Sequence, residues 1–148
     1  MQFSSKNISS VGRLLGYGGL IPFIGLAGLS FIISSDQRPL VIFNLLAYGV
    51  TIISFLGAIH WGLTMVESNP KKWRLLWGVA PSLLGWVSLM LQPDLGLLLV
   101  AVTLLLCLII DYKIYPEYGI GHWLGMRLVL GCVAITSTVL PAAWPLVG

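Results

Sequence analysis

The chain has 148 residues, of which 57% are hydrophobic and only 9% are charged, against about 25% charged residues in an ordinary soluble domain. Its formal net charge of +3 comes from a few basic residues separated by long uncharged runs. No basic patch is formed, which argues against nucleic acid as a partner. We therefore expect a single all-α membrane domain over residues 1–148, surrounded by membrane lipids.

The first expected span covers about residues 13–34 and follows a polar, serine-rich start that contains Lys6. Its uncharged run exceeds the apolar core of a signal peptide, which has about 7 to 15 residues, so we expect the helix to stay attached. Pro22 is tolerated in a membrane helix when neighbouring groups satisfy the freed carbonyl. The second span, at about residues 40–66, carries His60 and no Asp, Glu, Lys or Arg.

Three further spans are expected at about residues 74–92, 95–112 and 122–146. A very tight turn around Pro93 predicts that the third and fourth spans form an antiparallel helical hairpin. The chain is thus predicted to be an all-α bundle of five transmembrane helices.

Basic residues near the span ends predict the orientation of the bundle. With the N-terminus in the cytoplasm, seven basic residues lie on the cytoplasmic side and Arg38 alone lies outside, which agrees with the positive-inside rule. The C-terminus is then outside. The seven cytoplasmic residues are Lys6, Arg13, Lys71, Lys72, Arg74, Lys113 and Arg127.

His60 is the first candidate for function, because an ionisable side chain inside a span is costly to place there. On a helix it shares a face with Gly57 and Thr64, while Ser54 and Trp61 belong to a second small and polar face. A helix with two such faces is expected to be contacted from two sides, so we place the second span at the centre of the bundle. The same pattern also fits plain packing, since small residues let helix backbones approach.

Asp111 ends the fourth span on the side where Arg127 begins the fifth, so we expect an ion pair between them. Intramembrane charges commonly pair, and the expected role of this pair is to tie two helix ends together. Lys71, Lys72 and Arg74 are expected at the surface, where they attract anionic lipid by about 1 kcal/mol per charge.

His60 has three possible roles. It is a hydrogen-bonded core histidine, an axial haem ligand, or a proton relay or quinone partner, since histidine changes its charge near working pH. A haem would need a second ligand at similar depth, whereas His122 is expected closer to the membrane surface. No catalytic or metal-ligating pattern is present. The candidate ligand-binding or proton-relay residues are His60, Trp61, Ser54, Trp77, Asp111 and Arg127.

Three motifs carry a resemblance to a known family: Leu15-Gly16-Tyr17-Gly18-Gly19-Leu20-Ile21-Pro22-Phe23, Ser54-Phe55-Leu56-Gly57-Ala58-Ile59-His60-Trp61-Gly62 and Pro81-Ser82-Leu83-Leu84-Gly85-Trp86. Through them the chain resembles a family of small uncharacterised multi-span proteins, a domain of unknown function that includes the mitochondrial transmembrane protein 69. The resemblance implies five helical spans in a bacterial or mitochondrial inner membrane, and it supplies no activity. Within the motifs we take Gly57, Pro22 and Pro81 as packing positions. Because no Arg-rich transit segment precedes the first span, the bacterial inner membrane is expected.

The first functional hypothesis is non-enzymatic: an accessory, assembly or scaffold component of a membrane complex, with other inner-membrane proteins as partners. The alternative is a binder or carrier of a lipophilic small molecule, such as a quinone, haem or lipid, in a cytoplasmic-side pocket around His60. A proton-linked transporter or channel is a weaker alternative, because a pathway needs polar residues through both halves of the bundle.

Overall fold

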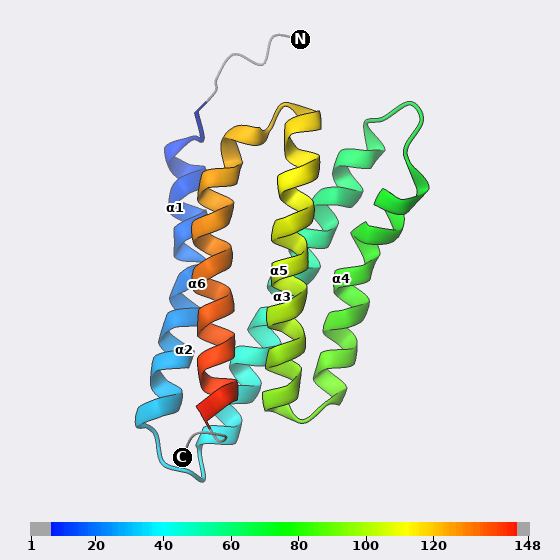
Figure 1. Cartoon of the computed structure of the whole chain (residues 1–148). Helices are drawn as coiled ribbons and strands as arrows, with labels where there is room; N and C mark the ends of the chain where they lie inside the picture. Colours follow the sequence, from blue (N-terminus) through cyan, green and yellow to red (C-terminus); the bar gives the residue numbers. More distant parts are fainter. Residues whose placement is uncertain (1–6, 145–148) are drawn as a thin grey trace.

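A computed structural model describes residues 7–144 and shows an all-α fold (Figure 1). Lys6 and the last residues of the expected fifth span therefore lie outside the described part of the chain. In chain order the elements are α1 (Ser10–Gly18), α2 (Leu20–Ile32), α3 (Arg38–Met65), α4 (Lys72–Met90), α5 (Pro93–Ile114), the 3-10 turns η1 (Tyr115–Tyr118) and η2 (Gly121–Trp123), and α6 (Leu124–Ala143).

Four helical segments of the described chain are long and apolar enough to cross a membrane: Ser10–Ile32, Arg38–Met65, Pro93–Tyr118 and Gly121–Ala143. The α4 helix is a fifth long helix, with 19 residues. It does not belong to this set, because tryptophan, glycine and two basic residues near its start lower its mean hydropathy. The expected bundle of five helices is present, and four of the five have the composition of a span.

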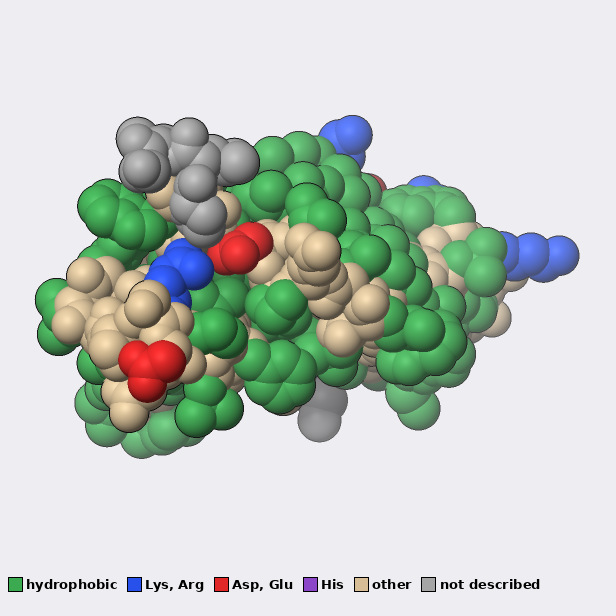
Figure 2. Space-filling model, turned by 90° about the horizontal axis from the view of Figure 1, so that it is seen from below, with side chains coloured by type: hydrophobic (Ala, Val, Ile, Leu, Met, Phe, Trp, Pro, Cys, Tyr) green, Lys and Arg blue, Asp and Glu red, His purple; other side chains and the backbone are tan. Residues whose placement is uncertain are grey.

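The helices run alternately up and down between two ends (Figure 1). One end holds the start of α1, the α3–α4 connection and the two 3-10 turns, and the other holds the α2–α3 and α4–α5 connections. Seen from this second end, most of the visible surface is hydrophobic, with a few acidic and basic side chains (Figure 2). Here Arg38 Nη2 donates to the Pro141 carbonyl at 2.8 Å and lies 3.8 Å from Asp94 Oδ1.

The first expected span is broken into α1 and α2 at Gly19. Pro22 has no N–H group, so the carbonyl four residues before it has no helical partner. The Gly19 N–H bonds the carbonyls of Leu15 and Gly16, each at 3.1 Å. The Tyr48 hydroxyl of α3 donates to the Gly19 carbonyl at 2.7 Å, which satisfies a backbone group at the break.

The α3 helix packs against each of α2, α4, α5 and α6. The face that carries Gly57, His60 and Thr64 is buried. Trp61, on the second small and polar face, is 43% exposed, so the expectation that helices cover both faces is wrong. The four neighbours of α3 therefore leave much of this second face uncovered.

Glycine residues allow the backbones of α3 and α4 to approach each other closely where the two helices cross. A Cβ atom added at Gly57 would lie 2.6 Å from the Gly78 carbonyl oxygen and 3.2 Å from Pro81 Cγ. Neither a carbonyl nor a proline ring can rotate away, so the contact requires the absence of a side chain. Gly57 and Pro81 therefore set the distance between the two backbones.

We expect Gly57→Ala to destabilise the protein by about 1 to 3 kcal/mol, the usual cost of overpacking. Gly62→Ala on the same helix is the matched control, because a Cβ there has nothing within 4 Å. Thermal unfolding of the two variants in detergent, followed by circular dichroism, measures the difference. Equal stability of the two variants would contradict the close crossing.

Candidate functional site

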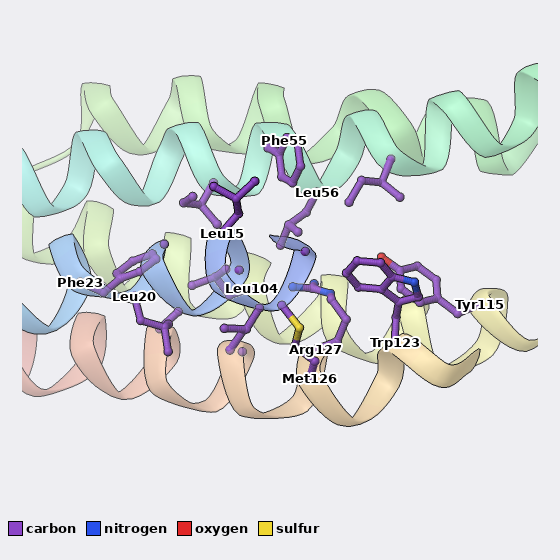
Figure 3. A pocket seen from close by; sticks show the side chains of 18 of the residues that line it. Leu15, Leu20, Phe23, Phe55, Leu56, Leu104, Tyr115, Trp123, Met126 and Arg127 are labelled. Carbon is purple, nitrogen blue, oxygen red and sulfur yellow. The ribbon is translucent and has the colours of Figure 1, made fainter. Parts of the chain in front are cut away.

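An elongated apolar cavity of about 470 Å³ lies between the α1–α2 segment, α3 and α6 (Figure 3). One wall runs from Trp123, at the end of η2, to Ala134 of α6, about 16 Å along the helix axis. Near Trp123 the wall includes Tyr115, and at the other end it includes Phe23. Further apolar lining comes from Leu15, Leu20, Ile52, Phe55, Leu56, Ile59, Leu104, Met126 and Leu130.

Arg127 is the one charged side chain among the described residues that line the cavity. It lies four residues after Trp123, the residue that directly precedes α6, so the two side chains are neighbours, as Figure 3 shows. The cavity therefore has apolar walls and a single cationic position near one end.

Behind this wall, Arg127 takes part in a buried cluster of three charged or ionisable side chains. Asp111 Oδ2 accepts hydrogen bonds from Arg127 Nε at 2.7 Å and lies 2.6 Å from Arg127 Nη2. Asp111 Oδ1 lies 2.7 Å from His60 Nε2. His60 and Asp111 are each 1% exposed, and Arg127 is 8% exposed. The cluster joins α3, α5 and α6.

The hydrogen-bond pattern defines which groups donate and which accept within this cluster. Arg127 is always protonated, and Asp111 beside it is a carboxylate that can only accept. His60 Nε2 must therefore carry the hydrogen that is donated to Asp111. The positive charge of Arg127 and the negative charge of Asp111 compensate each other within the cluster.

The structure brings together three of the six candidate site residues, His60, Asp111 and Arg127. The other three lie apart from this cluster. Trp61 is largely exposed, and Ser54 is half-buried on the same side of α3. Trp77 is half-buried on α4 and packs against the hydrophobic core. His60 itself does not line the cavity, because Ile59 and Leu56 form the α3 wall there.

Arg74 was expected at the lipid surface with Lys71 and Lys72, and this placement is wrong for Arg74. Lys71 and Lys72 are exposed, whereas Arg74 is 3% exposed. Its Nη1 atom donates to Glu67 Oε1 at 2.7 Å, and its Nη2 atom pairs with Glu117. Burial of the guanidinium is tolerated because two carboxylates neutralise it.

Tyr118 completes this second polar cluster. Its hydroxyl donates to Glu67 and accepts from Arg74 Nη1 at 3.1 Å. The hydrogen bond from Tyr118 lowers the pKa of Glu67, and the charge of Arg74 adds to this effect. The cluster ties the α3–α4 connection to η1, at the end of the bundle where the cavity carries Arg127.

Sequence reasoning missed the aromatic and apolar side chains of the cavity, including Tyr115, Trp123 and Met126. Apolar residues that line a cavity have the same pattern as those that fill a core, so no periodicity marks them. The only available signal was the His122-Trp123 pair, which repeats the His60-Trp61 pair of α3. Chemically, the lining offers apolar walls, one guanidinium, the hydroxyl of Tyr115 and the indole N–H of Trp123.

We expect Asp111→Asn to destabilise the protein by about 3 to 5 kcal/mol, because it leaves the buried Arg127 charge without a partner. Asp94→Asn is the matched control. Asp94 is 40% exposed and 3.8 Å from Arg38, so its loss should cost less than about 1 kcal/mol. Detergent-solubilised variants compared by thermal unfolding measure both effects. A smaller loss for Asp111→Asn than for Asp94→Asn would contradict the assigned charges.

For the second cluster, we expect Arg74→Gln to lower the free energy of unfolding by about 1.5 to 3 kcal/mol, the usual range for hydrogen bonds to charged groups. Lys72→Gln, two residues away and exposed, should change it by no more than about 0.5 kcal/mol. The same unfolding measurement applies. If the two variants behaved alike, Arg74 would be acting as a surface charge.

Comparison with known proteins places the chain in a family. Residues 9–143 match the family described as Protein of unknown function (DUF3429). The chain is 35% identical over 130 residues to Transmembrane protein 69 of Xenopus tropicalis, covering 84% of this chain and 51% of that protein. It is 30% identical over 128 residues to Transmembrane protein 69 of Mus musculus, covering 82% of this chain and 51% of that protein.

The chain thus spans about half the length of these curated relatives. No solved structure matches it. The resemblance carried by the three sequence motifs is confirmed, and the apolar helices agree with it. The chain is a multi-pass helical membrane protein that belongs to the DUF3429 family.

Proposed function

We propose that this protein binds a lipophilic small molecule within the membrane and holds its polar head at Arg127. The observation that carries the proposal is the apolar cavity with a single charged lining residue. Small-molecule sites typically measure about 300 to 1,000 Å³ and combine apolar walls with a few placed polar groups. The cavity of about 470 Å³ has both properties.

The buried cluster supports this proposal, because it explains how a charge can be held at an apolar wall. Asp111 neutralises Arg127 on the side away from the cavity. His60 forms a hydrogen bond with the other oxygen of the same carboxylate. The guanidinium is thereby fixed in orientation. Tyr115 takes a further hydrogen bond from it, and the N–H groups that neither Asp111 nor Tyr115 engages are available to a ligand. A preorganised donor of this kind binds an acceptor without a further ordering cost.

Among the ligand classes expected from the sequence, a quinone or lipid fits this geometry and haem does not. Neither His60 nor His122 lines the cavity. His60 Nε2 is also engaged with Asp111 at 2.7 Å. A haem in the cavity would therefore have no histidine as an axial ligand.

The orientation in the membrane belongs to the same proposal. Exposed basic residues lie at the end of the bundle that holds the start of α1, namely Arg13, Lys71, Lys72 and Lys113. Arg38 lies at the opposite end. We infer that the first end is cytoplasmic, that α4 is a fifth span, and that the membrane is the bacterial inner membrane. Lys71 and Lys72 then face anionic lipid headgroups.

The test is native mass spectrometry of the protein extracted gently from its own membrane, with two variants of α6. Leu130→Trp fills the cavity that Leu130 lines, and Leu128→Trp is the matched control, because Leu128 is 42% exposed and lies outside the cavity. We expect a companion of a few hundred daltons on the wild type and on Leu128→Trp. The fraction of Leu130→Trp protein that carries this companion should be at least tenfold smaller.

Other outcomes decide against the proposal. If the wild type and both variants retain equal amounts of the companion, the companion binds outside the cavity. A polypeptide companion in place of a small molecule would favour the accessory or assembly role.

A further inference from the structure

We propose that the head of the ligand is a neutral, flat, carbonyl-bearing ring of the quinone class, and not a carboxylate or a phosphate. This inference rests on the proposed function, because it concerns the occupant of the same cavity. It follows from the charge of the buried cluster, from the donors that remain free, and from the shape of the wall beside them.

The first argument is charge. An isolated arginine in an apolar wall would attract an anionic head, but Arg127 is already paired with Asp111 at 2.7 and 2.6 Å. The second oxygen of Asp111 is engaged with His60. A ligand carboxylate beside Arg127 would therefore add a second anion close to Asp111 in a medium of low dielectric constant. Such an unbalanced buried charge is strongly unfavourable.

The second argument is the kind of hydrogen bond that the site can make. A guanidinium has five N–H donors and no acceptor, and two of its nitrogen atoms, Nε and Nη2, are directed at Asp111. Tyr115 is hydrogen-bonded to the same guanidinium, and the N–H groups that are still left can donate to an acceptor on the ligand. A ring carbonyl accepts such bonds without bringing a charge. An amine head would instead meet a like charge.

The third argument is shape. Trp123 and Tyr115 line the cavity near Arg127 (Figure 3), and aromatic faces pack well against another flat ring. From there the wall continues past Leu130 to Ala134 and Phe23 without another charged side chain among the described residues. A ligand with a ring head at Arg127 and a hydrocarbon tail toward Phe23 matches the aromatic end of the cavity and the uncharged wall that follows it.

The test compares three probes with the same ten-carbon tail: 2-decyl-1,4-benzoquinone, undecanoate and decyl phosphate. The full chain is placed in nanodiscs of phosphatidylcholine. Bound probe is measured by mass spectrometry after rapid separation, and the amount bound to discs with the Leu130→Trp variant is subtracted. We expect the quinone to bind at least tenfold more tightly than either anion.

The outcomes separate this inference from the proposed function. If undecanoate or decyl phosphate binds as tightly as the quinone, still above the Leu130→Trp background, the head is anionic and the cavity remains a binding site. If no probe exceeds that background, both proposals fail.

Asp111→Asn gives a second readout. Removing the carboxylate leaves the charge of Arg127 uncompensated, so the preference for quinone over undecanoate should fall at least tenfold. A preference that is unchanged in a folded Asp111→Asn protein would overturn the charge argument. If this variant does not fold, the ranking of the three probes on the wild type decides alone.

Discussion

The Asp111 carboxylate connects three helices at the centre of this molecule, because each of its oxygens forms a hydrogen bond with a side chain of a different helix. One oxygen faces His60 of α3 and the other faces Arg127 of α6, while Asp111 itself belongs to α5. All three side chains are almost completely buried. In such surroundings an unpaired charge is far more costly than an exposed one. The three helices must therefore keep the relative positions that allow these bonds.

This constraint also shapes the cavity. Arg127 has two sides: one is bound to Asp111, and the other belongs to an otherwise apolar wall. His60, the first candidate from the sequence, lies behind that wall, where it contacts Asp111 and the ring of Tyr115. The residue of the buried cluster that lines the cavity is the arginine at the start of α6.

Sequence reasoning found what depends on local pattern. The helices follow from long apolar runs, and the pairing of Asp111 with Arg127 follows from their places at neighbouring helix ends. The break at Gly19 was missed, because its apolar run continues through the proline. The burial of Arg74 was missed because its partner Glu117 lies 43 residues away, and only the packing of η1 against the α3–α4 connection brings them together. The cavity has no sequence signal, since its lining looks like core.

The break between α1 and α2 sets off a short N-terminal helix that contributes to the cavity wall. No side chain of α1 is buried, yet Gly12, Leu15 and Gly16 form part of the cavity wall. Substitutions in α1 therefore change the cavity wall directly, and at Gly16 they also press on α6, because a Cβ atom there would lie 1.8 Å from Met126 Cε. Under the binding function that we propose, variation in α1 would alter the ligand while Arg127 keeps its buried partners.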